Sequence, residues 1–152
     1  MIATSAYIFA LLASALWFTM ALRYFGFQQF AAAKVMIAKT QRHSPVFPTF
    51  AAAVRFLGGM NGALALLSWS LLAIVLLGYD FFTAPAERIV LLIVLAAAHF
   101  SQFVFNVPVL KNGGRREAAY WDVLSGPMFF IFAMDAAQTI IALGAAIAIG
   151  LF

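Results

Sequence analysis

The chain has 152 residues, of which 66% are hydrophobic and 9% are charged, and its mean hydropathy is +1.03. These values exclude a water-soluble enzyme or binding module and indicate a protein of the lipid bilayer. The net charge is +4, but the basic residues stand beside long apolar segments, so topology and anionic headgroups explain them and no nucleic-acid partner is expected. Because there is no cysteine, disulfides, thiolate metal sites and cysteine nucleophiles are excluded.

Four apolar segments follow one another along the chain, and each reaches the roughly 20 residues that a helix needs to cross the hydrocarbon core. We expect spans at about residues 3–30, 50–78, 86–110 and 125–151. Helices are preferred to barrel strands because the segments do not alternate polar and apolar residues. The sequence therefore predicts an all-α, integral membrane four-helix bundle that forms a single domain over residues 1–152.

Residues typical of helix ends agree with these boundaries. Thr49 can cap the second span, and Pro85 with Glu87 fits the first turn of the third. The first segment has no basic residue before Arg23 and is too long for the core of a signal peptide, so we expect it to be a true span.

The basic residues predict the orientation in the membrane. They cluster around the first and third connections, residues 31–49 and 111–124, whereas only Arg88 lies near the second. Positively charged loops stay in the cytoplasm, so we expect both of these loops there and both termini outside. The abundant alanine favours a bacterial inner membrane, with the endoplasmic reticulum as the alternative. The loop residues expected to contact anionic lipids or a partner are Lys34, Lys39, Arg42, Lys111, Arg115 and Arg116.

One short piece of the third segment, AAAHFSQFVFN at residues 96–106, carries polar residues where lipid is expected. His99 lies roughly 20 Å along the helix, near the middle of the bilayer, and Gln102 and Asn106 share its face. Because lipid cannot satisfy these polar groups, this face is expected to point into the bundle.

Other spans place polar residues at a similar depth, namely Asn61 in the second span and Asp135 with Gln138 in the fourth. We therefore expect a mid-membrane layer of Asn61, His99, Gln102 and Asp135, in which Asp135 either pairs with His99 or stays neutral. Three interpretations stay open at this point. The layer could form hydrogen bonds that only stabilise helix packing, it could line a buried ligand or substrate pocket, or it could relay protons or ions.

The second span opens with RFLGGMNGALALLS at residues 55–68. Gly58 and Gly62 form a stripe of small residues that lets another backbone approach closely. We interpret the stripe as packing within the bundle, with a homodimer seam or a ligand groove as alternatives. Arg55 lies nearer the cytoplasmic face, where it could approach Asn106 or Gln102.

No pattern for a catalytic, cofactor or metal site is present. Bis-histidine haem needs two histidines within the membrane, and His43 lies in the first loop. His99 and Asp135 supply too few ligands for a zinc or di-iron site, and no phosphate-binding glycine loop occurs. We expect no cofactor, no metal and no catalytic residue, so an enzyme is the less favoured class.

Three short motifs carry a resemblance to known families: AAAHFSQFVFN with its histidine–phenylalanine pair His99-Phe100, Arg55-Phe56-Leu57-Gly58, and Gly126-Pro127-Met128. With them the chain resembles, over most of its length, the small four-span scaffold proteins of ergosterol biosynthesis. The DoxX-like four-span proteins are a competing resemblance. Gln102 stands where an acid is expected in the first family, and Asp135 has no counterpart there.

The first resemblance implies a non-enzymatic membrane protein that holds lipid- or sterol-modifying enzymes together. The expected function is therefore that of an accessory or scaffold protein. The alternatives are a small proton-coupled transporter and a membrane subunit that binds a lipid or quinone, both using the layer around His99 and Asp135. The expected partners are membrane lipids, with membrane enzymes or a second copy of the chain as protein partners.

Overall fold

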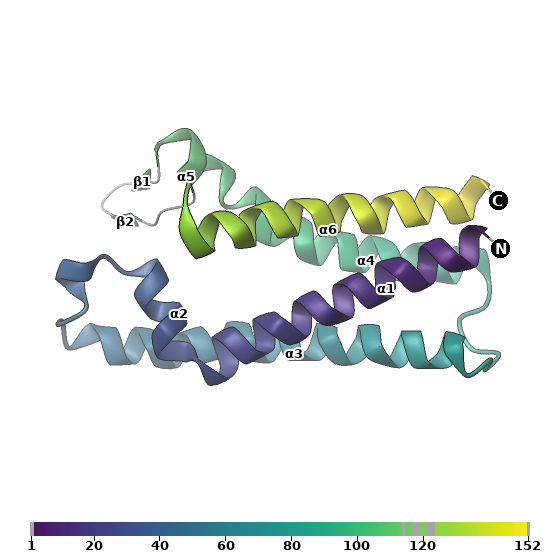
Figure 1. Ribbon diagram of the computed structural model, residues 1–152, viewed down its shortest axis with the longest axis horizontal. Helices are drawn as coiled ribbons and strands as arrows, with labels where there is room; N and C mark the ends of the chain where they lie inside the picture. Colours follow the sequence, from purple (N-terminus) through teal and green to yellow (C-terminus); the bar gives the residue numbers. More distant parts are fainter. Residues whose placement is uncertain (1, 114, 117–118, 121–123, 152) are drawn as a thin grey trace.

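The computed structural model describes residues 2–113, 115–116, 119–120 and 124–151, with 115–116 and 119–120 as backbone only. Within them the chain is almost entirely helical (Figure 1). The elements in chain order are α1 (Ile2–Ala21), the π-helix η1 (Leu22–Phe27), α2 (Gln29–Met36), the short 3₁₀ helix η2 (Lys39–Gln41), α3 (Val46–Leu76), α4 (Pro85–Val104), α5 (Val107–Lys111), the paired strands β1 (Arg115–Arg116) and β2 (Ala119–Tyr120), and α6 (Gly126–Leu151).

These helices confirm the predicted all-α class. Four helical segments are long and apolar enough to cross a membrane, and they are Ile2–Phe27, Val46–Leu76, Pro85–Lys111 and Gly126–Leu151. The chain is a multi-pass integral membrane protein.

The helix boundaries differ from expectation in three places. The second span begins at Val46, and its backbone N–H donates to Ser44 Oγ at 3.2 Å. The prediction of a cap at Thr49 was wrong, because Thr49 lies inside α3. The first span changes from α- to π-helix at residue 22, and the third is interrupted at residues 105–106 before α5. Glu87 lies where an acid was expected, and its carboxylate accepts the backbone N–H of Ala84 at 3.2 Å.

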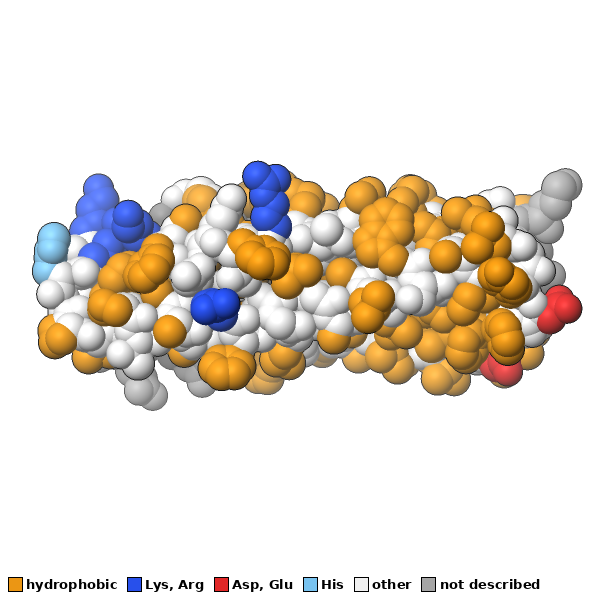
Figure 2. Space-filling view, turned by 90° about the horizontal axis from the view of Figure 1, so that it is seen from below, with side chains coloured by type: hydrophobic (Ala, Val, Ile, Leu, Met, Phe, Trp, Pro, Cys, Tyr) orange, Lys and Arg blue, Asp and Glu red, His pale blue; other side chains and the backbone are white. Residues whose placement is uncertain are grey.

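The two ends of the bundle differ in charge. Both termini and the α3–α4 connection lie at one end, here called the terminal end, and the other two connections lie at the opposite end, here called the loop end (Figure 1). On the face shown in Figure 2, the visible lysine and arginine side chains lie toward the loop end and the visible acidic side chains lie at the terminal end, where the structure also has Arg88 beside Tyr7. Exposed apolar side chains such as Phe9, Leu66 and Ile140 occupy the surface between the two ends. This distribution is the one that a membrane-spanning bundle requires.

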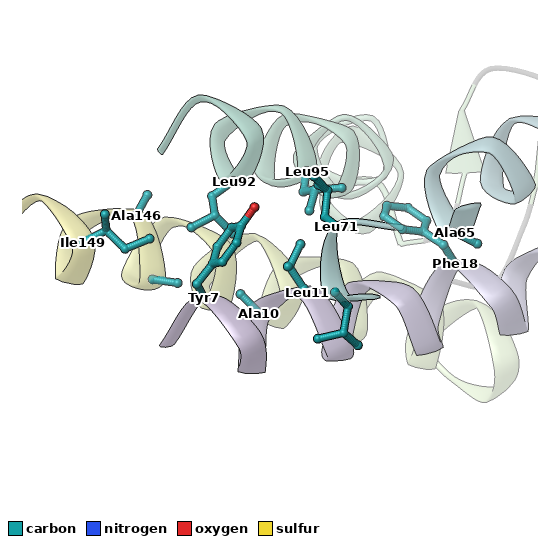
Figure 3. Close-up of a cluster of buried hydrophobic side chains, with 12 residues drawn as sticks. Tyr7, Ala10, Leu11, Phe18, Ala65, Leu71, Leu92, Leu95, Ala146 and Ile149 are labelled. Atoms are coloured by element: carbon teal, nitrogen blue, oxygen red, sulfur yellow. The ribbon is translucent and has the colours of Figure 1, made fainter. Parts of the chain in front are cut away.

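Helix α1 is the most deeply buried of the long helices. It runs diagonally between α3 and the α4–α6 pair (Figure 1). Tyr7, Leu11 and Phe18 of α1 have no exposed surface, and they pack against leucines of α3 and α4, including Leu71 and Leu92 (Figure 3). Because α1 stands between them, α3 has few contacts with α4 and α6.

The glycine stripe of α3 packs against the first span. A Cβ on Gly58 would lie only 2.3 Å from the backbone nitrogen of Gly26 in η1, so the two backbones touch. A Cβ on Gly62 would lie 3.1 Å from the side chain of Leu22. The stripe therefore serves packing inside this chain, at the point where α1 becomes a π-helix.

Candidate functional site

Two ionisable side chains meet in the interior of the bundle. His99 Nδ1 of α4 lies 3.2 Å from Asp135 Oδ1 of α6, and both side chains are 0% exposed. The helix rise had placed both residues at a similar depth, and in the structure they are in contact. It occurs because α4 and α6 pack against each other over most of their length.

Helix α1 completes this pair with residues that the sequence did not single out. Trp17 Nε1–H donates to Asp135 Oδ1 at 2.8 Å, and Ser14 Oγ lies 3.4 Å from His99 Nε2. The ring of Phe18 stacks on the imidazole, with 4.3 Å between centroids and 9° between planes. A usable signal was present, since Ser14, Trp17 and Phe18 recur at helical spacing on one face of the first span. We call the four hydrogen-bonding residues Ser14, Trp17, His99 and Asp135 the buried network.

The two carboxylate oxygens of Asp135 differ in their hydrogen bonding. Asp135 Oδ1 accepts from Trp17 and contacts His99, whereas Oδ2 has no partner among the described residues. A buried carboxylate costs several kcal/mol unless it is paired, so the contacts with Trp17 and His99 are what make its burial tolerable.

Gln138 lies one turn along α6 from Asp135 and is also buried. Its Nε2 donates to the carbonyl oxygen of Ala13 in α1 at 3.2 Å, while its Oε1 has no partner among the described residues. Thr139 Oγ1 donates to the carbonyl oxygen of Asp135 at 2.8 Å. The Thr139 hydrogen bond stays within α6, so the contact between α1 and α6 is strengthened at two levels by the hydrogen bonds Trp17–Asp135 and Gln138–Ala13.

A cavity of about 300 Å³ lies beside the buried network. It opens between the first span and α6, and Met20 and Phe130 on its wall are exposed. Trp17 belongs both to the cavity wall and to the network, so this one residue links the cavity to Asp135. The lining residues are Trp17, Met20, Ala21, Arg23, Tyr24, Phe25, Gln28, Gln102, Pro127, Phe130 and Ile131.

Comparison with known proteins adds no further identification. No family model, no curated protein and no solved structure matches the chain.

The predicted four-residue layer is only partly assembled. Asn61 is buried at a comparable depth, but its Nδ2 donates to the carbonyl oxygen of Leu57 in its own helix at 2.7 Å. It does not join the His99–Asp135 pair, because α1 stands between α3 and the other two helices. Gln102 is placed on the cavity wall instead.

The other predicted packing residues also keep to their own helices. Asn106 Nδ2 donates to the carbonyl oxygen of Gln102 at 2.7 Å. Arg55 is exposed on α3 and makes no hydrogen bond with Asn106. The expected approach of these two side chains does not occur.

The basic residues of the loop end have different environments. Lys34, Lys39 and Lys111 are exposed. Arg42 instead turns back to α2, where its Nε donates to the carbonyl oxygen of Ile37 at 3.0 Å and its Nη2 donates to that of Lys34. The side chains of Arg115 and Arg116 lie outside the described part of the structure.

Proposed function

We propose that this protein is a non-enzymatic membrane accessory protein that binds one amphipathic, lipid-class molecule in the cavity between its first span and α6. The single observation on which the proposal rests is the position of Trp17. This residue contributes to the cavity wall, and its N–H donates to the buried Asp135. A network that holds one face of a cavity in place is what a preorganised binding site needs.

The chemistry of the cavity supports this class of ligand. Its volume of about 300 Å³ is at the lower end for small-molecule sites, and its wall combines apolar side chains with a few polar groups. The exposed Met20 and Phe130 lie within the apolar belt, so a ligand can enter sideways from the bilayer. Phospholipids, sterols and quinones all fit this description.

The accessory role is supported by the loop end of the bundle. Helix α3 has 31 residues, which corresponds to about 46 Å, whereas the hydrocarbon core is about 30 Å thick. Part of α3 therefore extends beyond the hydrocarbon, and we place its first turns there together with α2, at the end where the basic residues lie. These segments and the exposed Lys34, Lys39 and Lys111 offer a surface to a membrane enzyme, a second copy of the chain or anionic lipids.

A second candidate function is proton-coupled transport of the same ligand. It is favoured by the contact between His99 and Asp135, since such a pair can gain and lose a proton. In proteoliposomes, a carrier would move protons together with the ligand, and His99→Leu would abolish both fluxes. Ligand binding without proton movement leaves the accessory function as the better account.

Fluorescence of Trp17 tests the primary proposal. In nanodiscs, a variant with Trp69→Phe and Trp121→Phe leaves Trp17 as the single emitter. Brominated phosphatidylcholine and brominated phosphatidylglycerol, each added at a low mole fraction, should quench Trp17 more steeply than random lipid contact allows. Unbrominated phospholipid, sterol or quinone should relieve the quenching if that class competes for the cavity.

Two controls make this experiment decisive. A variant with Trp69 alone reports on α3, where that indole is exposed and donates to Thr19 Oγ1 at 3.0 Å. A cavity-filling Ala21→Phe substitution should remove the excess quenching of Trp17 while circular dichroism shows an unchanged helix content. If Trp17 and Trp69 are quenched alike, and Ala21→Phe changes neither, the cavity is not a ligand site.

The accessory role needs its own measurement. Affinity purification of the full chain in mild detergent should recover a lipid-modifying membrane enzyme, and Lys34→Glu with Lys39→Glu should reduce its recovery. Purification of the chain with lipids alone would contradict the accessory role.

A further inference from the structure

The position of Arg23 bears on which lipid the cavity takes. Helix α1 has 20 residues, which corresponds to about 30 Å, or one hydrocarbon thickness. Arg23 is the second residue of η1, near the loop end of the span Ile2–Phe27, so its long side chain can extend to the lipid headgroups at that end. It is also one of the residues that line the cavity.

Arg23 has no counter-ion within the described part of the structure. Its side chain is exposed, and no ion pair or hydrogen bond engages it there. None of the lining residues is acidic. Asp135 does not line the cavity and is engaged with Trp17 and His99, while Asp80 and Glu87 lie at the terminal end. Among the described residues, the cavity mouth therefore carries the positive charge of Arg23 and no negative charge.

Polar and apolar groups are ordered along the cavity. Arg23 and the amide of Gln28 lie toward the loop end of the first span, whereas Met20 precedes them on α1. Phe130 and Ile131 of α6 contribute the facing apolar wall. This order matches a molecule with an anionic head at the membrane surface and a hydrocarbon chain directed into the bilayer.

Resting on the proposed function, we infer that the cavity selects an anionic phospholipid, whose phosphate group is bound by the Arg23 guanidinium and whose first acyl segment lies against Met20, Phe130 and Ile131. A guanidinium forms paired, charge-assisted hydrogen bonds with a phosphate, and these bonds are about twice as strong as neutral ones. A neutral headgroup, or one that also carries a positive charge, gains less from this site.

Native mass spectrometry of the full chain tests this selection. Protein is released from micelles that contain equal amounts of phosphatidylglycerol and phosphatidylcholine. The wild-type chain should retain one phosphatidylglycerol in preference to phosphatidylcholine. Arg23→Gln should reduce that preference by about tenfold, the value of a lost charge-assisted hydrogen bond, and Arg23→Lys should retain part of it.

Arg55→Gln is the matched control for the same loss of charge. Arg55 is an exposed arginine within a span, on α3, but it does not line the cavity. If Arg23→Gln and Arg55→Gln lower phosphatidylglycerol retention equally, general attraction to an anionic surface explains the result and the selection is refuted. Thermal unfolding of both variants should match the wild type, because both side chains are exposed.

Three further results show which part of the proposal fails. Relief of phosphatidylglycerol binding by inorganic phosphate alone would identify a free phosphate as the ligand and overturn the lipid assignment. If phosphatidylcholine and phosphatidylglycerol are retained equally while Ala21→Phe removes both, the cavity binds lipid but does not select an anion. If Ala21→Phe leaves phosphatidylglycerol retention unchanged, the lipid binds elsewhere and both proposals fail.

Discussion

Replacing His99 by leucine tests how strongly the buried network holds the bundle together. In the variant Asp135 keeps the N–H of Trp17 at 2.8 Å but loses its contact with the imidazole, and Oδ2 already lacks a partner among the described residues. His99 and Asp135 lie within ion-pair distance, and removing one partner of a buried ion pair costs about 3–5 kcal/mol. The lost ring stack with Phe18 adds about 0.5–1.5 kcal/mol. We expect the free energy of unfolding to fall by about 4 kcal/mol.

Asp135→Leu removes the charge but leaves two donors without an acceptor. The N–H of Trp17 and the ring nitrogen of His99 both lose their partner, and each orphaned group costs about 1–3 kcal/mol. Removal of the poorly paired carboxylate offsets part of this cost. We expect a loss of about 2 kcal/mol.

The double variant should be far less destabilised than the sum of the two single variants. It carries neither the buried carboxylate nor the imidazole, so only Trp17 and Ser14 lose their partners. We expect a coupling energy of about 2 kcal/mol or more between His99 and Asp135. This value clearly exceeds the roughly 0.6 kcal/mol that is average for hydrogen bonds between membrane helices.

The assay is a denaturing-detergent titration of the full chain, followed by circular dichroism, on the wild type, both single variants and the double variant. Asn61→Leu combined with His99→Leu is the control, because Asn61 is buried but bonds only within its own helix. That combination should be additive within about 0.5 kcal/mol. Equal additivity for His99 and Asp135 would show that their contact contributes nothing to stability and would refute this account.

Two further predictions concern packing and topology. Gly58→Ala should lower the free energy of unfolding by about 1–3 kcal/mol, because its Cβ would meet the backbone of Gly26, whereas Gly59→Ala faces open space and should be neutral or stabilising in the same titration. Equal effects of the two substitutions would contradict the close contact. Because the chain has no cysteine, Thr40→Cys and Thr83→Cys can be labelled singly. An impermeant thiol reagent added to intact cells should label Thr83→Cys only, and the reverse would invert the topology proposed from the basic loops.

Much of the fold follows from local properties of the chain. A segment in hydrocarbon must satisfy its own backbone hydrogen bonds, so length and hydropathy suffice to predict four helices. Helix rise also placed His99 and Asp135 at compatible depths, and the structure has them in contact. Their proposed roles in ligand binding or proton transfer stay predictions.

The sequence by itself determined the helical class, the number of spans and the depth of each polar residue, because these depend on one segment and its solvent. Only the tertiary structure decided which faces meet. It placed α1 between α3 and the α4–α6 pair, which brought Trp17 and Ser14 to Asp135 and His99 and left Asn61 apart. The physical reason is that lipid is as apolar as the helix surfaces, so hydrophobicity does not choose helix partners. The shapes of the helix surfaces choose the partners, as in the contact of Gly58 with Gly26. Such complementarity between distant segments is not visible in either segment alone.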